Sequence, residues 1–327
     1  MERFGLAVLG CGWIAHRHAV AAQALGERIA LSFASRDQRR AETYRARYGG
    51  MAAYGSYQAA VTDPAVEGVV ICTPHDRHLA DALLAVAHGK HVLVEKPMAR
   101  TLEEADHMIQ AAQAAGVALM VAENFRFMPA FRAVRVLLAQ GWLGSLRQIQ
   151  IMAWGYRDQK GWRLSAAAVG GGALIDGGIH YVDLLLQWGG RPARVFALVP
   201  PKSIAQMEGE DAVSLLVHLG GSVVGLLSLS LAARRVPRLQ WSTLTGTAGT
   251  LFVEHGGRGL WLRSERGQRI RMFLRDRRGY RAMLTEFVEA VRAGRLPEMD
   301  GVQGRGDLAM VVAAYRSHQT GLPVELE

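Results

Sequence analysis

Short apolar segments alternate with helix-like segments through the first 122 residues. The apolar segments are Gly5–Leu9, Ile29–Ala34, Gly68–Cys72, His91–Val94 and Val117–Val121, and the helix-like ones are Ile14–Ala24, Gln38–Tyr48, Leu79–His88 and Leu102–Ala115. Strands that are apolar throughout are typical of a parallel sheet covered by helices on both faces. Thr101 with Glu104 is typical of a capping box at a helix start. This part of the chain therefore predicts an α/β Rossmann-type domain with a doubly wound parallel sheet.

After residue 123 the expected strands follow one another with few helices between them. We expect strands at Leu146–Trp154, Arg194–Val199, Val213–Leu219, Val223–Leu231, Gln240–Thr245 and Leu251–Val253, and helices at Ala173–Trp188, Tyr280–Ala293 and Leu308–Ser317. This order predicts an α+β domain with a mainly antiparallel sheet. The 327 residues thus divide into two expected domains, 1–122 and 123–327, in line with a prior of ~150 residues per domain.

Composition restricts the class of protein. Half of the residues are hydrophobic and a fifth are charged, which is typical of a globular chain. Cys11 and Cys72 are too few for a disulfide framework or a four-cysteine zinc site, which favours the reducing cytoplasm. We expect no signal peptide before Phe4. The apolar stretch Val213–Ala233 contains serines and a Gly220–Gly221 pair, which predict two strands and a turn rather than a membrane span.

The chain is basic, with 38 lysines and arginines against 29 acidic residues and a formal net charge of +9. No basic run reaches five residues, and no nucleic-acid-binding motif accompanies the charge. We therefore favour a solvated, arginine-rich surface over nucleic-acid binding. An anionic cofactor or substrate is compatible with the excess charge.

A glycine loop lies between the first expected strand and the first expected helix. Gly10 permits a tight turn, Gly12 lets a pyrophosphate approach the backbone, and the small Ala15 allows the helix to pack closely on the strand. Trp13 and Ile14 open the helix, whose N-terminus offers unpaired N–H groups to phosphates. The loop predicts a dinucleotide site, with a merely structural tight turn as the alternative.

The end of the second strand bears on the choice of cofactor. An NAD site usually has an acidic residue there, which binds the ribose hydroxyls. In this sequence Ser35 and Arg36 stand in that place, followed by Asp37 and Arg39. A hydroxyl and a guanidinium suit a 2′-phosphate, so we favour NADP over NAD. In the alternative, Arg36, Arg39 and Arg40 form an exposed helix start that Asp37 caps.

Two further motifs carry candidate chemistry. Lys96, one of four lysines, follows the fourth main strand, at the edge where open α/β sheets bind ligands, and its ammonium could donate to a substrate oxygen. After the triplet Gly170–Gly172, Asp176 and His180 lie one helical turn apart and form a possible acid/base pair. Gly177 and Gly178 would let another group approach that helix closely. The alternatives are a surface lysine and a structural Asp–His pair.

These motifs together resemble the Gfo/Idh/MocA oxidoreductase family. The resemblance rests on the loop Gly10–Ala15, Thr73–Pro74 with His78, the segment His88–Val92 leading into Glu95–Lys96–Pro97, Asn124 with Arg126–Phe127 and Pro129, and the glycine triplet with Asp176 and His180. They follow the order of the family and cover nearly the whole chain.

The resemblance implies a Rossmann domain followed by an open-faced sheet that often mediates oligomers, here a homodimer or homotetramer. It implies a catalytic group of Lys96, Asp176 and His180, places Glu95 and Asn124 near the nicotinamide, and places Thr73, Pro74 and His78 beside the cofactor. It also implies a cis bond before Pro97.

The family's chemistry needs no metal. Pairs such as His16 with His18 and His75 with His78 therefore remain a weak metal alternative, and Cys11 is not interpreted as a nucleophile.

The segment Trp154–Gly172, between a strand and the Asp176–His180 helix, has the composition of a substrate-side loop, with Lys160 among its cations. Its candidate contacts are Tyr156, Arg157, Trp162 and Arg163, because aromatic faces suit sugar rings and cations suit carboxylates or phosphates. Arg126 is a candidate by position. An ordinary exposed connection is the alternative.

The expected function is reversible hydride transfer between a nicotinamide cofactor and a CH–OH group of a sugar, polyol or cyclitol-like small molecule. His180 would take or return the hydroxyl proton, Lys96 would hydrogen-bond the same oxygen, and Asp176 would orient His180. A dihydrodiol or aldehyde dehydrogenase of the same fold and a non-catalytic NADP-binding sensor are the alternatives.

Overall fold

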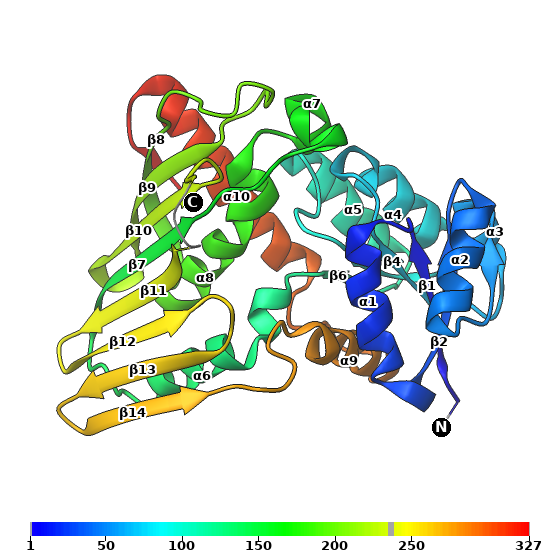
Figure 1. Ribbon diagram of the computed structural model, residues 1–327, viewed down its shortest axis with the longest axis horizontal. Coiled ribbons are helices and arrows are strands. Elements are labelled where there is room, and N and C mark those ends of the chain that lie inside the picture. The colour runs from blue at the N-terminus through cyan, green and yellow to red at the C-terminus, as the bar shows by residue number, and fades with distance from the viewer. Residues whose placement is uncertain (1, 235–238, 327) are drawn as a thin grey trace. The chain divides into compact units, whose positions relative to one another are not determined.

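The computed structural model describes residues 2–234 and 239–326 (Figure 1). The chain forms two compact units. The first holds the residues up to Asn124 together with Tyr280–Arg305, and the second holds Phe125–Gly279 and the residues from Gly306 onward. The predicted boundary at residue 123 puts Tyr280–Arg305 in the second domain. The segment joins the first unit because its helix packs against helix α1 and because the Val121 N–H donates to the Met299 carbonyl oxygen.

The first unit contains a six-stranded parallel sheet in the order β3-β2-β1-β4-β5-β6. Its strands are β1 Phe4–Leu9, β2 Ile29–Ala34, β3 Ala53–Tyr54, β4 Gly68–Ile71, β5 His91–Val94 and β6 Leu119–Val121. Every residue of β1, β4 and β6 is buried, as expected for strands covered on both faces. This confirms the doubly wound sheet, to which the structure adds the short edge strand β3.

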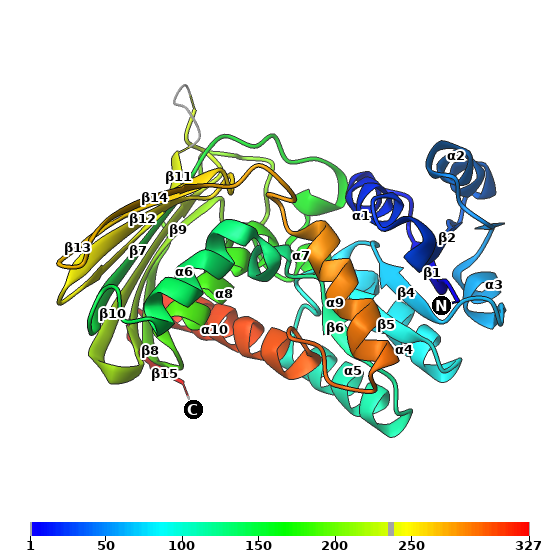
Figure 2. The ribbon, with the colours of Figure 1, turned by 90° about the horizontal axis from the view of Figure 1, so that it is seen from below.

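Helices lie on both faces of this sheet (Figure 2). They are α1 Trp13–Gln23, α2 Gln38–Tyr48, α3 Tyr57–Thr62, α4 His78–Ala87, α5 Leu102–Ala114 and α9 Tyr280–Arg292. The Thr101 hydroxyl accepts from the Glu104 N–H, which confirms the expected cap of α5. Asp37 caps α2 in the same way, by accepting from the Arg39 N–H.

The second unit contains a nine-stranded sheet in the order β14-β13-β12-β11-β7-β10-β9-β8-β15. Its strands are β7 Leu146–Trp154, β8 Pro192–Leu198, β9 Ala212–Leu219, β10 Val223–Ser230, β11 Leu239–Gly246, β12 Gly249–Glu254, β13 Gly259–Ser264, β14 Gly267–Met272 and β15 Val324–Glu325. Neighbouring strands are antiparallel except for β7 and β10, which run parallel. The predicted α+β domain is confirmed, and the expected hairpin at Gly220–Gly221 joins β9 to β10.

The helices of this unit are α6 Pro129–Ala139, α7 Ala166–Val169, α8 Ile179–Gly189 and most of α10 Gly301–Thr320. Figure 2 shows α6 and α8 on one face of the curved sheet. The single helix expected at Ala173–Trp188 differs in one respect, because Leu174–Gly178 forms a π-helical turn (η5) that leads into α8. Among the described residues, no helix combines the length and apolar character needed to cross a bilayer.

Candidate active site

The glycine loop after β1 has the geometry of a dinucleotide site. Gly10 has a φ of +94°, and a Cβ there would lie 3.1 Å from the Cys72 carbonyl oxygen, so the turn requires glycine. Gly12 has an ordinary φ of −101°, and a Cβ would meet no described protein atom within 4 Å. The protein's own packing therefore does not explain Gly12. The open space beside it fits a cofactor phosphate.

The N-terminus of α1 suits an anion. In the described part of the chain no side chain caps this helix and its first turn holds no acidic residue, whereas Asp37 and Thr101 cap α2 and α5. The first N–H groups and the helix dipole therefore remain available to phosphate oxygens. The Tyr44 hydroxyl donates to the Gly12 carbonyl oxygen (2.9 Å) and fixes the loop against α2.

The other three loop residues differ in exposure. Ala15 is fully buried, as its expected close packing requires. Trp13 is 64% exposed, with the Arg17 guanidinium over its ring, and Ile14 is half-buried. Trp13 therefore has surface available for a bound molecule.

The end of β2 presents positive charge. Arg36 and Arg39 are exposed, and Ser35 is buried with its Oγ accepting from the Asp37 N–H (3.2 Å). The Asp37 carboxylate is engaged as the cap of α2, as in the alternative interpretation. Burial raises the pKa of the Cys11 thiol to about 11, and the positive charge of Arg40 opposes that rise.

Buried polar side chains connect the ends of β4 and β5. The Thr73 hydroxyl donates to Asp81 (2.8 Å), and Pro74 is half-buried beside it. The two ring nitrogens of His78 lie 3.0 Å from the Thr73 carbonyl oxygen and 2.9 Å from that of Pro97. Burial lowers the pKa of His78, and its carbonyl partners oppose that effect. His78 thus has a structural role, and its place beside a cofactor stays a prediction.

The Glu95–Lys96–Pro97 motif follows β5, and the Lys96–Pro97 bond is cis, as the resemblance implied. Glu95 is buried, with its Oε1 2.7 Å from His18 Nε2 and its Oε2 accepting from the Lys96 N–H. Lys96 is half-buried and Asn124 is buried. The sequence indicated His18 only as a metal-ligand alternative, and no pattern in it pointed to this contact with Glu95.

In the second unit, the π-helical turn and α8 carry the expected acid/base pair. Asp176 is buried, and Arg163 Nε donates to its Oδ2 (3.2 Å). His180 is half-buried, and its ring stacks on Phe125 with 4.4 Å between centroids and 11° between planes. Single-turn π-bulges are often found at functional sites. Phe125 was not among the predicted site residues, although it directly follows Asn124 in the motif that carries the resemblance.

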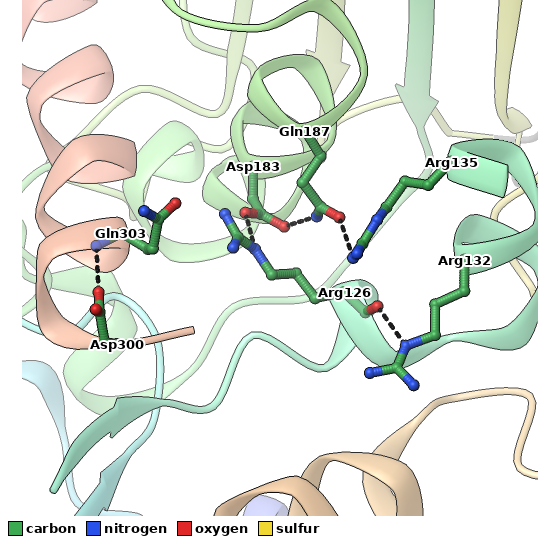
Figure 3. Close-up of polar contacts among 7 residues, drawn as sticks. All are labelled: Arg126, Arg132, Arg135, Asp183, Gln187, Asp300 and Gln303. Carbon is green, nitrogen blue, oxygen red and sulfur yellow. Dashed lines mark hydrogen bonds and ion pairs between the residues drawn. The ribbon is translucent and has the colours of Figure 1, made fainter. Parts of the chain in front are cut away.

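Arg126 is held inside the second unit. Its Nε donates to Asp183 Oδ1 (2.7 Å), and the Asp183 side chain is fully buried. The Gln187 amide also donates to Asp183, and Arg135 contacts Gln187 (Figure 3). Arg126 therefore has a structural role, whereas its contact with a substrate stays a prediction. Asp183 was missed, although it lies one turn after His180 on the same helix.

The expected substrate-side segment presents aromatic and cationic groups together. Tyr156 and Arg157 are exposed, and Trp162 is half-buried with the Arg163 guanidinium over its ring at 4.4 Å. Arg163 also contacts Asp176, so this segment is connected to the π-helical turn within one unit.

The histidines of the two candidate pairs have other contacts. His16 Nδ1 lies 2.6 Å from the Tyr48 hydroxyl, and the rings of His75 and His78 lie 5.5 Å apart. Within residues 2–234 and 239–326, no group of three or more His, Cys, Asp or Glu side chains could hold a metal ion.

Comparisons with known proteins identify the family. The model of an oxidoreductase family with an NAD-binding Rossmann fold matches residues 4–123, and the model of the GFO/IDH/MocA C-terminal domain matches residues 131–252. Trans-1,2-dihydrobenzene-1,2-diol dehydrogenase of Mus musculus is 33% identical over 241 residues, which cover 73% of this chain and 69% of the relative. 1,5-Anhydro-D-fructose reductase of Ensifer adhaerens is 28% identical over 342 residues, covering 100% of this chain and 99% of the relative.

A solved structure has the same fold over nearly the full length. Aldose-aldose oxidoreductase from Caulobacter crescentus, complexed with glycerol, superposes with a TM-score of 0.91 at 26% identity, covering 99% of this chain and all of that one. The two matched family models account for most of the chain. The chain belongs to the Gfo/Idh/MocA family of oxidoreductases and carries its NAD-binding Rossmann domain and its C-terminal domain.

Proposed function

We propose that this enzyme interconverts a CH–OH and a C=O group in a sugar, polyol or cyclitol-like substrate, with NADP(H) as the preferred cofactor. The bound nicotinamide supplies or accepts the hydride. The full-length similarity to a 1,5-anhydro-D-fructose reductase supports a carbohydrate substrate. The similarity to trans-1,2-dihydrobenzene-1,2-diol dehydrogenase favours a cyclic dihydrodiol as the second candidate.

The placement of His180 is the observation that carries this proposal. A half-buried imidazole stacked on Phe125 keeps a fixed ring plane while part of its surface stays accessible. Asp176 precedes it by four residues and contacts Arg163. An imidazole held in a fixed plane is suited to take a proton from a hydroxyl group.

Each of the three candidate groups has a separate role in the proposal. His180 moves the proton of the reacting hydroxyl. Lys96 donates a hydrogen bond to the same oxygen and stabilises the negative charge that develops there. Asp176 orients His180 or bonds a neighbouring hydroxyl. Aromatic and cationic side chains of the substrate-side segment, among them Trp162 and Arg163, bind the rest of the ring.

The preference for NADP is supported by the charges at the end of β2. Arg36 is exposed there, the Asp37 carboxylate serves the cap of α2, and Ser35 retains a hydroxyl proton to donate. A guanidinium and a hydroxyl bind a 2′-phosphate, whereas a free ribose hydroxyl pair is usually bound by a carboxylate.

Absorbance of the reduced nicotinamide tests the reaction. Purified protein is mixed with NADP or NAD and a panel of sugars, cyclitols and trans-dihydrodiols, and the reverse reaction is tested with 1,5-anhydro-D-fructose. Turnover of a carbohydrate is expected, and turnover of the dihydrodiol alone would select the second candidate. Lys96→Ala is expected to abolish turnover and leave the cofactor dissociation constant largely unchanged. Lys90→Ala is the matched control, because Lys90 is also half-buried but binds two backbone carbonyls.

The cofactor preference has its own test. Arg36→Asp should weaken NADP binding by about 10- to 100-fold, the equivalent of roughly 1.5–3 kcal/mol for a hydrogen bond to a charged group. NAD binding should change much less. Arg45→Asp, an equal change of charge at the other end of α2, should leave the ratio of the two affinities unaltered. Equal loss of both cofactors in Arg36→Asp contradicts the proposed contact.

We further propose that two copies of the chain associate through the face of the nine-stranded sheet opposite α6 and α8. Large apolar side chains are exposed there, among them Phe252, Trp261 and Ile270, which lie side by side on β12, β13 and β14. Trp261→Glu is expected to shift sedimentation equilibrium toward the monomer. Leu296→Glu, at an exposed apolar residue of the first unit, should not. A wild-type protein that sediments as a monomer at all concentrations contradicts this proposal.

A further inference from the structure

The glycine triplet before η5 packs against two side chains that come from elsewhere in the second unit. A Cβ on Gly171 would lie 2.5 Å from the Tyr315 hydroxyl oxygen, and one on Gly172 would lie 2.4 Å from the backbone nitrogen and carbonyl oxygen of Glu210. Any larger residue would displace Tyr315 and Glu210. The triplet therefore preserves a close approach to these two residues.

Glu210 and Tyr315 together satisfy four successive backbone N–H groups at the start of this helical segment. The Tyr315 hydroxyl oxygen accepts from the N–H groups of Gly172 (3.1 Å) and Ile175 (3.3 Å). The Glu210 carbonyl oxygen accepts from Ala173 (2.7 Å), and its Oε1 accepts from Leu174 (2.8 Å).

The next N–H group begins the helix itself. The Asp176 N–H donates to the Gly172 carbonyl oxygen (3.1 Å), as in regular helical pairing. Residues 172–175 thus provide the four N–H groups that a helix start leaves without an internal partner. Most helices satisfy such groups with a side chain at the cap position or with water. Here the acceptors are Glu210, which precedes strand β9, and Tyr315 of helix α10.

The two capping side chains also bind each other. The Tyr315 hydroxyl donates to Glu210 Oε1 (3.0 Å). Burial raises the pKa of Glu210, and burial together with the Glu210 charge raises that of Tyr315 well above its usual value. A carboxylate at a helix N-terminus is favourable for the helix dipole. The cap is therefore a connected unit of two side chains rather than two independent contacts.

We propose that Glu210 and Tyr315 are positioning residues that fix the axial height and rotation of the segment carrying Asp176 and His180. This inference rests on the roles given to Asp176 and His180 in the proposed function. Asp176 lies one residue after the last capped N–H group, and His180 follows four residues later. A shift of the capped turn therefore moves both side chains together.

The experiment compares three variants of the full chain. Tyr315→Phe removes the hydroxyl that accepts from two N–H groups, Glu210→Ala removes the carboxylate, and Glu210→Gln keeps an acceptor for Leu174. Because a misplacement of about 1 Å can cost up to ~100-fold in rate, we expect kcat to fall about 10- to 100-fold in Tyr315→Phe and Glu210→Ala. Glu210→Gln should recover a large part of the loss, and cofactor affinity should stay within about twofold because the glycine loop belongs to the first unit.

Ser317→Ala is the matched control for lost stability. Ser317 lies on the same helix α10, is buried, and its hydroxyl bonds Ala197 and Leu322 but not the turn at 172–175. Its loss should lower the unfolding midpoint and leave kcat unchanged. The pH profile of kcat provides a second measurement, which should shift in Tyr315→Phe and not in Ser317→Ala.

The following results distinguish a failure of the positioning role from a failure of the proposed function. If folded Tyr315→Phe and Glu210→Ala proteins lose stability but keep the wild-type kcat and pH profile, the pair is only a structural cap and the inference is wrong. If His180→Ala keeps full activity, the proposed function itself fails. An inactive His180→Ala with a fully active Tyr315→Phe overturns the positioning role alone.

Discussion

The buried ion pair between Arg126 and Asp183 permits a quantitative prediction for Arg126→Ala. The guanidinium donates to a carboxylate whose side chain is fully buried, and the Arg126 side chain itself is 10% exposed. Removal of the guanidinium leaves the Asp183 charge in a low-dielectric environment. The neutral Gln187 amide, which also donates to Asp183, cannot replace the lost charge.

The expected magnitude follows from the burial of the pair. Breaking a buried ion pair by removing one partner costs about 3–5 kcal/mol. For a unit of roughly 150–250 residues, each kcal/mol lowers the unfolding midpoint by ~2–4 °C. Arg126→Ala should therefore lower the midpoint of the second unit by roughly 6–20 °C.

Differential scanning calorimetry measures this shift, and an exposed ion pair gives the control. Arg194 and Glu325 belong to the same unit, but their side chains are 56% and 64% exposed. Arg194→Ala should cost at most ~1 kcal/mol. A double variant, Arg126→Met with Asp183→Leu, should recover much of the lost stability because both members of the buried pair are replaced by apolar side chains.

The same experiment decides between the two interpretations of Arg126. A guanidinium that binds substrate would give a higher KM and a nearly normal unfolding midpoint after substitution. If Arg126→Ala is no less stable than Arg194→Ala, the ion pair does not stabilise the unit and the structural argument is refuted.

Two further predictions concern the glycine loop and a buried histidine. Gly12→Ala should leave the unfolding midpoint unchanged and weaken cofactor binding in a fluorescence titration, because its Cβ meets open space, whereas Gly10→Ala should destabilise the fold through its φ of +94°. An equal loss of stability in both variants would contradict this distinction. Burial lowers the pKa of His255 to about 3. Below pH ~6.5 the His255 side chain therefore binds a proton in the unfolded chain but not in the folded protein, and the free energy of unfolding falls as the pH decreases toward 3. His255→Gln should remove a slope of up to ~1.4 kcal/mol per pH unit from urea unfolding between pH 6.5 and 4.

Local sequence signals sufficed for most of the first unit. Each of its five expected strands is present, because a parallel strand buried on both faces has an uninterrupted apolar sequence. Strand β3 was not predicted, because two residues are too few to show a pattern of apolar and polar side chains. Helix α6 was missed although Pro129 stands at its first turn and Phe131 and Val134 lie on its buried face, a pattern that was available.

In the second unit, several features could not be predicted from local sequence patterns. All six residues of β14 are exposed, and its arginines alternate with Gln268, Ile270 and Met272, so its sequence does not predict one buried face. The parallel pairing of β7 with β10 joins strands that are far apart in the chain, and only the complete sheet determines it. The N–H groups of Leu174 and Ile175 in the π-helical turn likewise donate to Glu210 and Tyr315, partners that no local pattern around Leu174 reveals.

The glycines near the candidate site fall into two groups with different meanings. Gly171, Gly172 and Gly178 are explained by the protein itself, since a Cβ on Gly178 would lie 2.8 Å from Leu229 and the first two face Tyr315 and Glu210. The sequence interpretation of Gly178 as a point of close approach was thus correct, and the approaching group is a strand of the same unit.

Gly12 and Gly177 have no such explanation. Both have an ordinary backbone conformation, and a Cβ on either would meet no described protein atom within 4 Å. Glycine in a helical turn costs about 1 kcal/mol relative to alanine, so Gly177 weakens its own turn without improving the packing around it. One of the two lies at the uncapped start of α1, and the other lies between Asp176 and His180. At both positions the backbone is open to the close approach of a bound molecule, and this observation is independent of the acid/base argument for Asp176 and His180.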